Sequence, residues 1–173
     1  MAATTSKEIP AAEAEISPND YRIVVEFLED WGLASSIKPE YNVNDAFSKV
    51  VGGVLKLISA HRGKISCILS AKPPVLNGIG RLHGGAVASV AERVAIACAK
   101  TVVHKDEDLF LGDLSISYLS SAPRNAEIVV DAFVISSEKK QAIIGLNFRI
   151  EETGRLLYLS RATFESMPLS SRL

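Results

Sequence analysis

The sequence of 173 residues has few cysteines and no excess of charge. Only Cys67 and Cys98 are present, at no metal-binding or redox spacing, so we expect free thiols in a reducing compartment and no bound metal. Lys and Arg number 19 against 20 Asp and Glu, a net charge of −1. This balance gives no electrostatic reason to expect a nucleic acid or an anionic membrane as partner.

Long hydrophobic runs are also missing. No apolar run approaches the ~20 uncharged residues that a membrane-spanning helix needs. The first residues, MAATTSKEIPAAEAEI, lack the apolar core of a signal peptide and are too acidic for an organelle transit peptide. Because residues 1–16 show no periodicity and are rich in Ala, Thr and Glu, we predict a disordered tail there.

The chain is nevertheless 47% hydrophobic, which suits one globular domain with a full-sized core. Apolar residues recur at helical spacing over 17–32, and Trp31 is expected to anchor this helix. A short second helix is predicted around residues 44–50. Together these helices form a predicted N-terminal helical segment, 17–52.

The rest of the chain alternates strand-like runs with turns. Six strands and one long apolar helix are predicted, the strands at 54–60, 64–71, 110–120, 127–137, 141–151 and 155–165 and the helix at 84–103.

Short connections favour an antiparallel meander of the last four strands. A helix that is apolar on nearly every side must be covered on nearly every side. We therefore predict an α+β fold over 53–167, a curved antiparallel sheet wrapped around one long central helix, followed by a tail at 168–173. The edges of a single sheet offer a surface for a second copy.

One carboxylate, Glu92, lies in the middle of this apolar helix. Its neighbours at helical contact spacing are Ala88, Ser89, Ala95 and Ile96, none of them basic, so no ion pair along the helix explains it. Two interpretations stay open: a residue on the helix's solvent stripe, or a carboxylate that lines a cleft and acts as base or nucleophile.

The helix begins with Gly84 and Gly85, directly after His83. Small residues at a helix start let a ligand approach backbone N–H groups, which with the positive end of the helix dipole suit an oxyanion or a polarised carbonyl. A tight loop-to-helix turn with a structural histidine is the other interpretation.

Glu92 follows Gly84 by eight residues, which is about 12 Å along one helix. The two cannot serve the same carbonyl from one chain. If both belong to one site, Glu92 must come from a second, two-fold-related copy, and the site lies on a dimer interface.

The segment 77–85, NGIGRLHGG, followed by Glu92, resembles the signature of hotdog-fold acyl-CoA thioesterases. The phenylacetate-pathway and acyl-CoA thioesterase 13-like groups are the most similar. The order of elements from residue 54 to about 166 matches that fold, so the resemblance covers roughly two thirds of the chain.

This resemblance implies an enzyme that hydrolyses an acyl-CoA thioester to a carboxylic acid and free coenzyme A, with no cofactor besides the substrate's own coenzyme A. It implies that the thioester oxygen meets the N–H of Gly84, helped by Gly85. Glu92 of the facing subunit would activate water or attack directly, while Asn77 and His83 hold thioester and water in line. A homodimer that assembles to a homotetramer and a role in lipid metabolism are further implications.

Coenzyme A also carries phosphates that need partners. Beside Gly85, the candidate substrate-binding residues are Ser120, Ser121 and Arg124, after the third strand, and Lys139 in the next turn. For Arg124 and Lys139, solvated turn charges are the other interpretation.

The chain ends in Ser171-Arg172-Leu173. This tripeptide matches the peroxisomal address of the Ser-Lys-Leu type, with Arg in place of Lys. We therefore expect the peroxisomal import receptor as a partner and the peroxisome as location, with the cytoplasm as the alternative.

Two other functions remain in view. A non-catalytic acyl-CoA-binding hotdog domain would keep the helix-start site without turnover. A hotdog enoyl-CoA hydratase is disfavoured, because such enzymes usually present the acid ahead of the histidine on the helix. Long, short and aromatic acyl groups are all compatible with the pattern.

Overall fold

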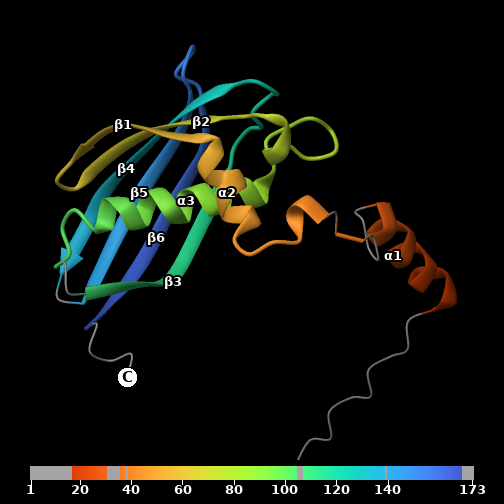
Figure 1. The fold of residues 1–173 in the computed structure, drawn as a ribbon, viewed down its shortest axis with the longest axis horizontal. Helices are drawn as coiled ribbons and strands as arrows, with labels where there is room; N and C mark the ends of the chain where they lie inside the picture. Colours follow the sequence, from red (N-terminus) through yellow and green to blue (C-terminus); the bar gives the residue numbers. More distant parts are fainter. Residues whose placement is uncertain (1–16, 31–35, 38, 105–106, 139, 169–173) are drawn as a thin grey trace, which may run out of the picture. The chain divides into compact units, whose positions relative to one another are not determined.

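The computed structural model describes residues 17–30, 36–37, 39–104, 107–138 and 140–168 (Figure 1). The chain divides into two compact units, Met1–Val43 and Asn44–Leu173. The predicted N-terminal tail, Trp31, Lys139 and the C-terminal tripeptide lie outside the described residues.

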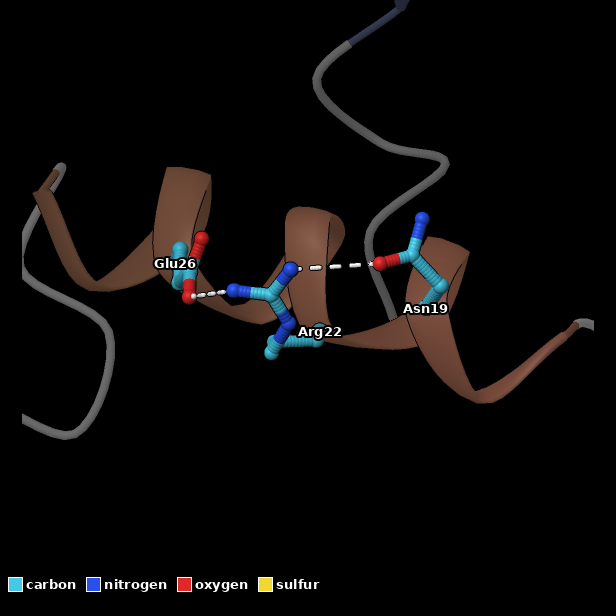
Figure 2. Close-up of polar contacts among 3 residues, drawn as sticks. All are labelled: Asn19, Arg22 and Glu26. Carbon is cyan, nitrogen blue, oxygen red and sulfur yellow. Dashed lines mark hydrogen bonds and ion pairs between the residues drawn. The ribbon is translucent and has the colours of Figure 1, made fainter.

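The first unit contains α1 (Pro18–Asp30) and a short 3-10 helix, η1 (Pro39–Tyr41). Ser17 begins α1 as predicted, since its hydroxyl accepts a hydrogen bond from the N–H of Asp20 at 3.1 Å. On the helix surface Arg22 bridges Glu26, at 2.9 Å, and Asn19, at 3.1 Å (Figure 2). Such exposed pairs contribute only a few tenths of a kcal/mol each.

The second unit holds a six-stranded sheet and two α-helices. The helical elements are α2 (Ala46–Gly53), η2 (Pro73–Val75) and α3 (Gly84–Ala99), and the strands are β1 (Leu55–His61), β2 (Lys64–Ser70), β3 (Glu107–Tyr118), β4 (Glu127–Glu138), β5 (Gln141–Ile150) and β6 (Leu156–Pro168). All six predicted strands are confirmed, with their ends shifted by a few residues. The predicted segment 17–52 spans both units, because α2 packs on β1, η2 and α3.

The strand order is β1-β2-β4-β5-β6-β3, with every pair antiparallel. The predicted meander of the last four strands is therefore wrong for β3, which pairs with β6 and not with β4. The reason lies in the connection 119–126. Leu119 and Ser120 both donate to the carbonyl of Leu157 in β6, whereas Asn125 donates to the carbonyl of Ala71, just after β2. The connection thus crosses the end of the sheet and starts β4 beside β2.

The core lies between α3 and the sheet, whose strands pass behind the helix from β1 to β3 (Figure 1). The covered face of α3 consists of small and β-branched residues, including Val87, Val90 and Val94. The sheet contributes fully buried large side chains such as Leu69, Phe148 and Phe164. The prediction of one central helix covered by one sheet is confirmed.

The helix predicted to run to residue 103 ends at Ala99. Thr101 explains the early end, because its hydroxyl donates to the carbonyl of Cys98 at 2.7 Å and accepts from the N–H of Gly63 at 2.7 Å. These bonds tie the end of α3 to the turn between β1 and β2.

Both cysteines are free and buried, as predicted. Burial raises the pKa of the Cys67 thiol, and it raises the pKa of Cys98 to about 11. Both therefore remain neutral thiols near neutral pH. Among the described residues no helix has the length and apolar character to span a membrane.

A core substitution tests the packing. We expect Leu69→Ala to lower the free energy of unfolding by about 2–5 kcal/mol, because Leu69 is 0% exposed and its truncation leaves a cavity. The matched control is Leu57→Ala in β1, 58% exposed, with an expected change within about 0.5 kcal/mol. Equal losses in denaturant titrations at matched protein concentration would contradict the observed burial.

Candidate active site

The start of α3 is capped by the side chain of His83. This residue has extended backbone angles, φ −69° and ψ 132°, and its Nδ1 accepts a hydrogen bond from the N–H of Gly85 at 2.9 Å. Since Nδ1 accepts, the neutral imidazole carries its hydrogen on Nε2. The ring is exposed, so this N–H is a donor available at the helix start.

The same peptide unit, between Gly84 and Gly85, is held at its carbonyl group by Tyr118, at the end of β3. The Tyr118 hydroxyl donates to the carbonyl of Gly84 at 3.0 Å. The Tyr118 ring packs edge-on against Tyr158, with 5.5 Å between centroids, and the Tyr158 hydroxyl accepts from the N–H of Ala122 at 3.2 Å. Burial raises the pKa of Tyr158, so it stays protonated. The peptide unit between Gly84 and Gly85 is thus fixed at both its N–H and its carbonyl group.

The N–H of Gly84 is left uncommitted, since no described residue accepts a hydrogen bond from it. The N–H of Ala86 has no acceptor among the described residues either, but Ala86 is buried whereas Gly84 is partly exposed. An added Cβ at Gly84 would meet the Tyr118 ring at 3.5 Å, an ordinary contact, so packing within this chain does not require glycine there. At Gly85 a Cβ would lie only 3.1 Å from Nδ1 of His83, and the N–H is already engaged. Gly85 therefore serves the cap, and Gly84 presents the free donor.

Asn77 shapes the loop that leads into His83. Its Oδ1 accepts hydrogen bonds from the N–H groups of Ile79, at 3.2 Å, and Arg81, at 3.0 Å. Gly80 in this loop has φ +73°, a conformation that glycine adopts without strain. The side-chain oxygen of Asn77 is committed to the loop, so in this chain the residue acts on the loop's shape.

Glu92 lies two turns into α3 on the stripe that the sheet does not cover, together with Gly85, Ser89 and Ile96. It is half-buried, and neither of the two ion pairs among the described residues includes it. The helix itself separates it from Gly84 by about 12 Å, as eight residues at 1.5 Å require. One chain therefore does not bring these two groups together.

The connection after β3 places Ser120 and Ser121 at the same end of the sheet as Gly84. The N–H of Leu82 donates to the carbonyl of Ala122 at 3.1 Å, which ties this connection to the loop before the helix. The hydroxyl of Ser120 accepts a hydrogen bond from the guanidinium of Arg155.

The two other predicted substrate-binding residues differ in their surroundings. Arg124 lines a pocket together with three glutamates, Glu127, Glu151 and Glu152. Lys139 lies outside the described residues. The described strand ends on either side of it, Glu138 and Gln141, lie at the opposite end of the sheet from the start of α3. Gln141 pairs with Glu165, whereas Tyr118 pairs with Tyr158, seven residues earlier in β6.

Sequence reasoning missed Tyr118, Arg81 and Arg155. Tyr118 ends a clear alternating run, but its contact with Gly84 joins positions 34 apart and depends on strand order. Neither arginine has a predicted role: Arg81 lies inside the segment 77–85 without one, and Arg155 belongs to no motif. Within the described part of the chain, no group of three or more His, Cys, Asp or Glu side chains is arranged to hold a metal ion.

Comparisons with known proteins concern the fold and the family. A family model described as the thioesterase superfamily matches residues 79–157, from the loop before His83 into β6. Human acyl-coenzyme A thioesterase 13 is 29% identical over 117 residues, which cover 68% of this chain and 82% of that protein.

Solved structures share the fold. Mouse thioesterase superfamily member 2 has a TM-score of 0.64 at 24% identity, over 70% of this chain and 88% of that one. A Streptococcus mutans protein, whose crystal structure is bound to acetyl-CoA, has a TM-score of 0.61 at 14% identity, over 66% and 89% of the two chains. The predicted hotdog fold is confirmed, and residues 79–157 are similar to the thioesterase superfamily.

Proposed function

We propose that the protein is an acyl-CoA thioesterase, which hydrolyses an acyl-CoA thioester to a carboxylic acid and free coenzyme A. The observation that carries the proposal is the uncommitted N–H of Gly84 at the positive end of α3, on a peptide chain held rigid around it. The similarity to human acyl-coenzyme A thioesterase 13 and the acetyl-CoA bound to a structural relative support the substrate class.

The chemistry follows from the charge that develops during thioester cleavage. Attack on the thioester carbon moves charge onto the carbonyl oxygen, and the fixed Gly84 N–H with the helix dipole stabilises that oxyanion. A donor that is already oriented needs no reorganisation during the reaction. The hydrogen bonds that Tyr118 and His83 make with the Gly84–Gly85 peptide unit therefore strengthen the stabilisation of the oxyanion by the adjacent Gly84 N–H. Coenzyme A then leaves as a thiolate, which is a good leaving group.

Glu92 of a second copy completes the site in this proposal, as general base toward water or as nucleophile. The edge strand β3 supports such a dimer, because it pairs with β6 on one side only and exposes 60% of Phe110. If two copies pair antiparallel along β3, their α3 helices run side by side in opposite directions. The middle of one helix, with Glu92, then faces the start of the other, with Gly84.

His83 and Asn77 have supporting roles. The Nε2–H of His83 is oriented toward bound thioester or water, because Nδ1 is occupied by Gly85. Asn77 stabilises the loop before His83, because its Oδ1 accepts hydrogen bonds from two backbone N–H groups of that loop.

Further assembly to a homotetramer also belongs to this proposal. Exposed apolar side chains on the outer face of the sheet, Phe133, Ile135 and Leu159, support a contact between dimers.

Replacing Gly84 tests the oxyanion donor. Gly84→Pro deletes the N–H at the first helical position, where proline is well tolerated, and the extended His83 before it suits a following proline. We expect kcat for acyl-CoA hydrolysis to fall about 10²- to 10³-fold with an unchanged circular dichroism spectrum. Gly84→Ala keeps the N–H and is the control, with most activity retained. An active proline variant would rule out this donor.

Glu92→Gln removes the carboxylate but keeps its shape, and we expect kcat to fall by about 10²- to 10⁴-fold. Release of coenzyme A is followed with a thiol reagent. Saturable acyl-CoA binding without thiol release by the wild type would instead favour the non-catalytic binding domain.

Mixing variants tests the shared site. Co-refolded chains carrying Glu92→Gln and Gly84→Pro form mixed dimers in which one site combines the native Glu92 of one chain with the native Gly84 of the other. Random pairing restores about a quarter of wild-type activity. A site built within one chain would show no recovery, since every chain carries one defect.

The tripeptide Ser171-Arg172-Leu173 motivates the proposed peroxisomal location and a role in lipid metabolism. A fluorescent protein fused ahead of the chain, with Leu173 as the free carboxyl end, is expected to colocalise with a peroxisomal marker. The same fusion without the last three residues is expected to remain in the cytoplasm. Identical distributions of the two fusions would exclude the tripeptide as the address.

A further inference from the structure

We propose that Arg81 and Arg155, together with Ser121, bind the phosphate groups of coenzyme A. This inference rests on the proposed function and names the residues that hold the nucleotide end of its substrate. The three side chains line one pocket of about 320 Å³, whose walls also include Pro123, Thr153 and Leu157.

The charge of this pocket is uncompensated. No carboxylate lines it, and neither arginine takes part in an ion pair among the described residues. Arg155 is steadied by a neutral partner, the Ser120 hydroxyl, which leaves its positive charge and its other N–H donors available. Guanidinium groups match the oxygens of a phosphate with two parallel hydrogen bonds, so a pair of them in one pocket favours this ligand.

A neighbouring pocket of about 360 Å³ provides the contrast. It shares Pro123 and Ile150 with the first pocket and contains Arg124, but three glutamates line it as well. One arginine against three glutamates gives a charge of −2, whereas the pocket of Arg81 and Arg155 has +2. A phosphate entering beside Arg124 would meet carboxylates, so the geometry assigns phosphate binding to the first pocket.

The pocket is fixed to the backbone that presents the oxyanion donor. Arg81 precedes Gly84 by three residues, which limits their Cα separation to roughly 11 Å. Arg81 forms an isolated β-bridge with Pro123, so the loop is hydrogen-bonded to the connection after β3. In coenzyme A the phosphates lie at the far end of the pantetheine arm from the thioester. The pocket residue Arg81 lies near Gly84 but outside the helix start, so phosphates held there and a thioester at Gly84 would occupy separate positions along one segment.

The test compares two substrates that share one acyl group, an acyl-CoA and the corresponding S-acyl pantetheine, which lacks the phosphates. We expect Arg81→Gln and Arg155→Gln each to raise KM for the acyl-CoA about 10- to 100-fold, with kcat nearly unchanged. Neither change affects hydrolysis of the pantetheine thioester. Arg124→Gln, also exposed, is the matched control and leaves both substrates unaffected. A dephospho-CoA thioester, which lacks only the 3′-phosphate, separates the contribution of that group to KM from the contribution of the diphosphate.

Three results overturn the proposal: an unchanged KM in both variants, an equal loss with the pantetheine thioester, or an increase in KM confined to Arg124→Gln. Failure of the proposed function looks different, because the wild type then hydrolyses neither substrate. In that case calorimetry with adenosine 3′,5′-bisphosphate decides. Binding that weakens at least tenfold in the Arg81 and Arg155 variants, but not in Arg124→Gln, supports the site, and absent binding to the wild type refutes it.

Discussion

Two hydrogen bonds on a single peptide unit hold the start of α3 in the form that the rest of the site requires. The carbonyl of Gly84 receives the hydroxyl of Tyr118, and the N–H of Gly85 is taken by His83. Each bond polarises the amide in the direction that strengthens the other. The preceding N–H, that of Gly84, remains pointing outward at the positive end of the helix. Without this restraint the first turn of α3 would fray, as helix ends do.

The unusual path of the chain after β3 brings the remaining groups to this point. Because residues 119–126 cross the end of the sheet from β6 to β2, Tyr118 lies against the helix start, and Ser121 follows beside Arg81. The same crossing leaves β3 at the edge of the sheet. One topological feature therefore supplies a wall of the proposed phosphate pocket, a restraint on the proposed oxyanion donor and the edge strand along which the proposed dimer would pair.

Sequence reasoning reached the parts that depend on local pattern. Alternation revealed the six strands, the apolar run revealed α3, and the isolation of Glu92 marked it as unusual. The pairing of β3 with β6 was beyond it, because short connections usually join neighbouring strands and nothing local signals a crossing. Sequence reasoning could not choose which arginines are candidates for phosphate binding, for a similar reason. Arg124 and Arg155 are alike in sequence, and only their neighbours in space, glutamates for one and hydroxyls for the other, set them apart.

The burial of Cys67 and Cys98 has a consequence for an enzyme that releases a thiol as product. Disulfide exchange proceeds through an accessible thiolate, and it would join an exposed protein cysteine to coenzyme A whenever the surroundings turn oxidising. Here both sulfur atoms are protonated and inaccessible, one in β2 and one on the covered face of α3. The fold thereby prevents both protein thiols from reacting with the thiol that is released as product.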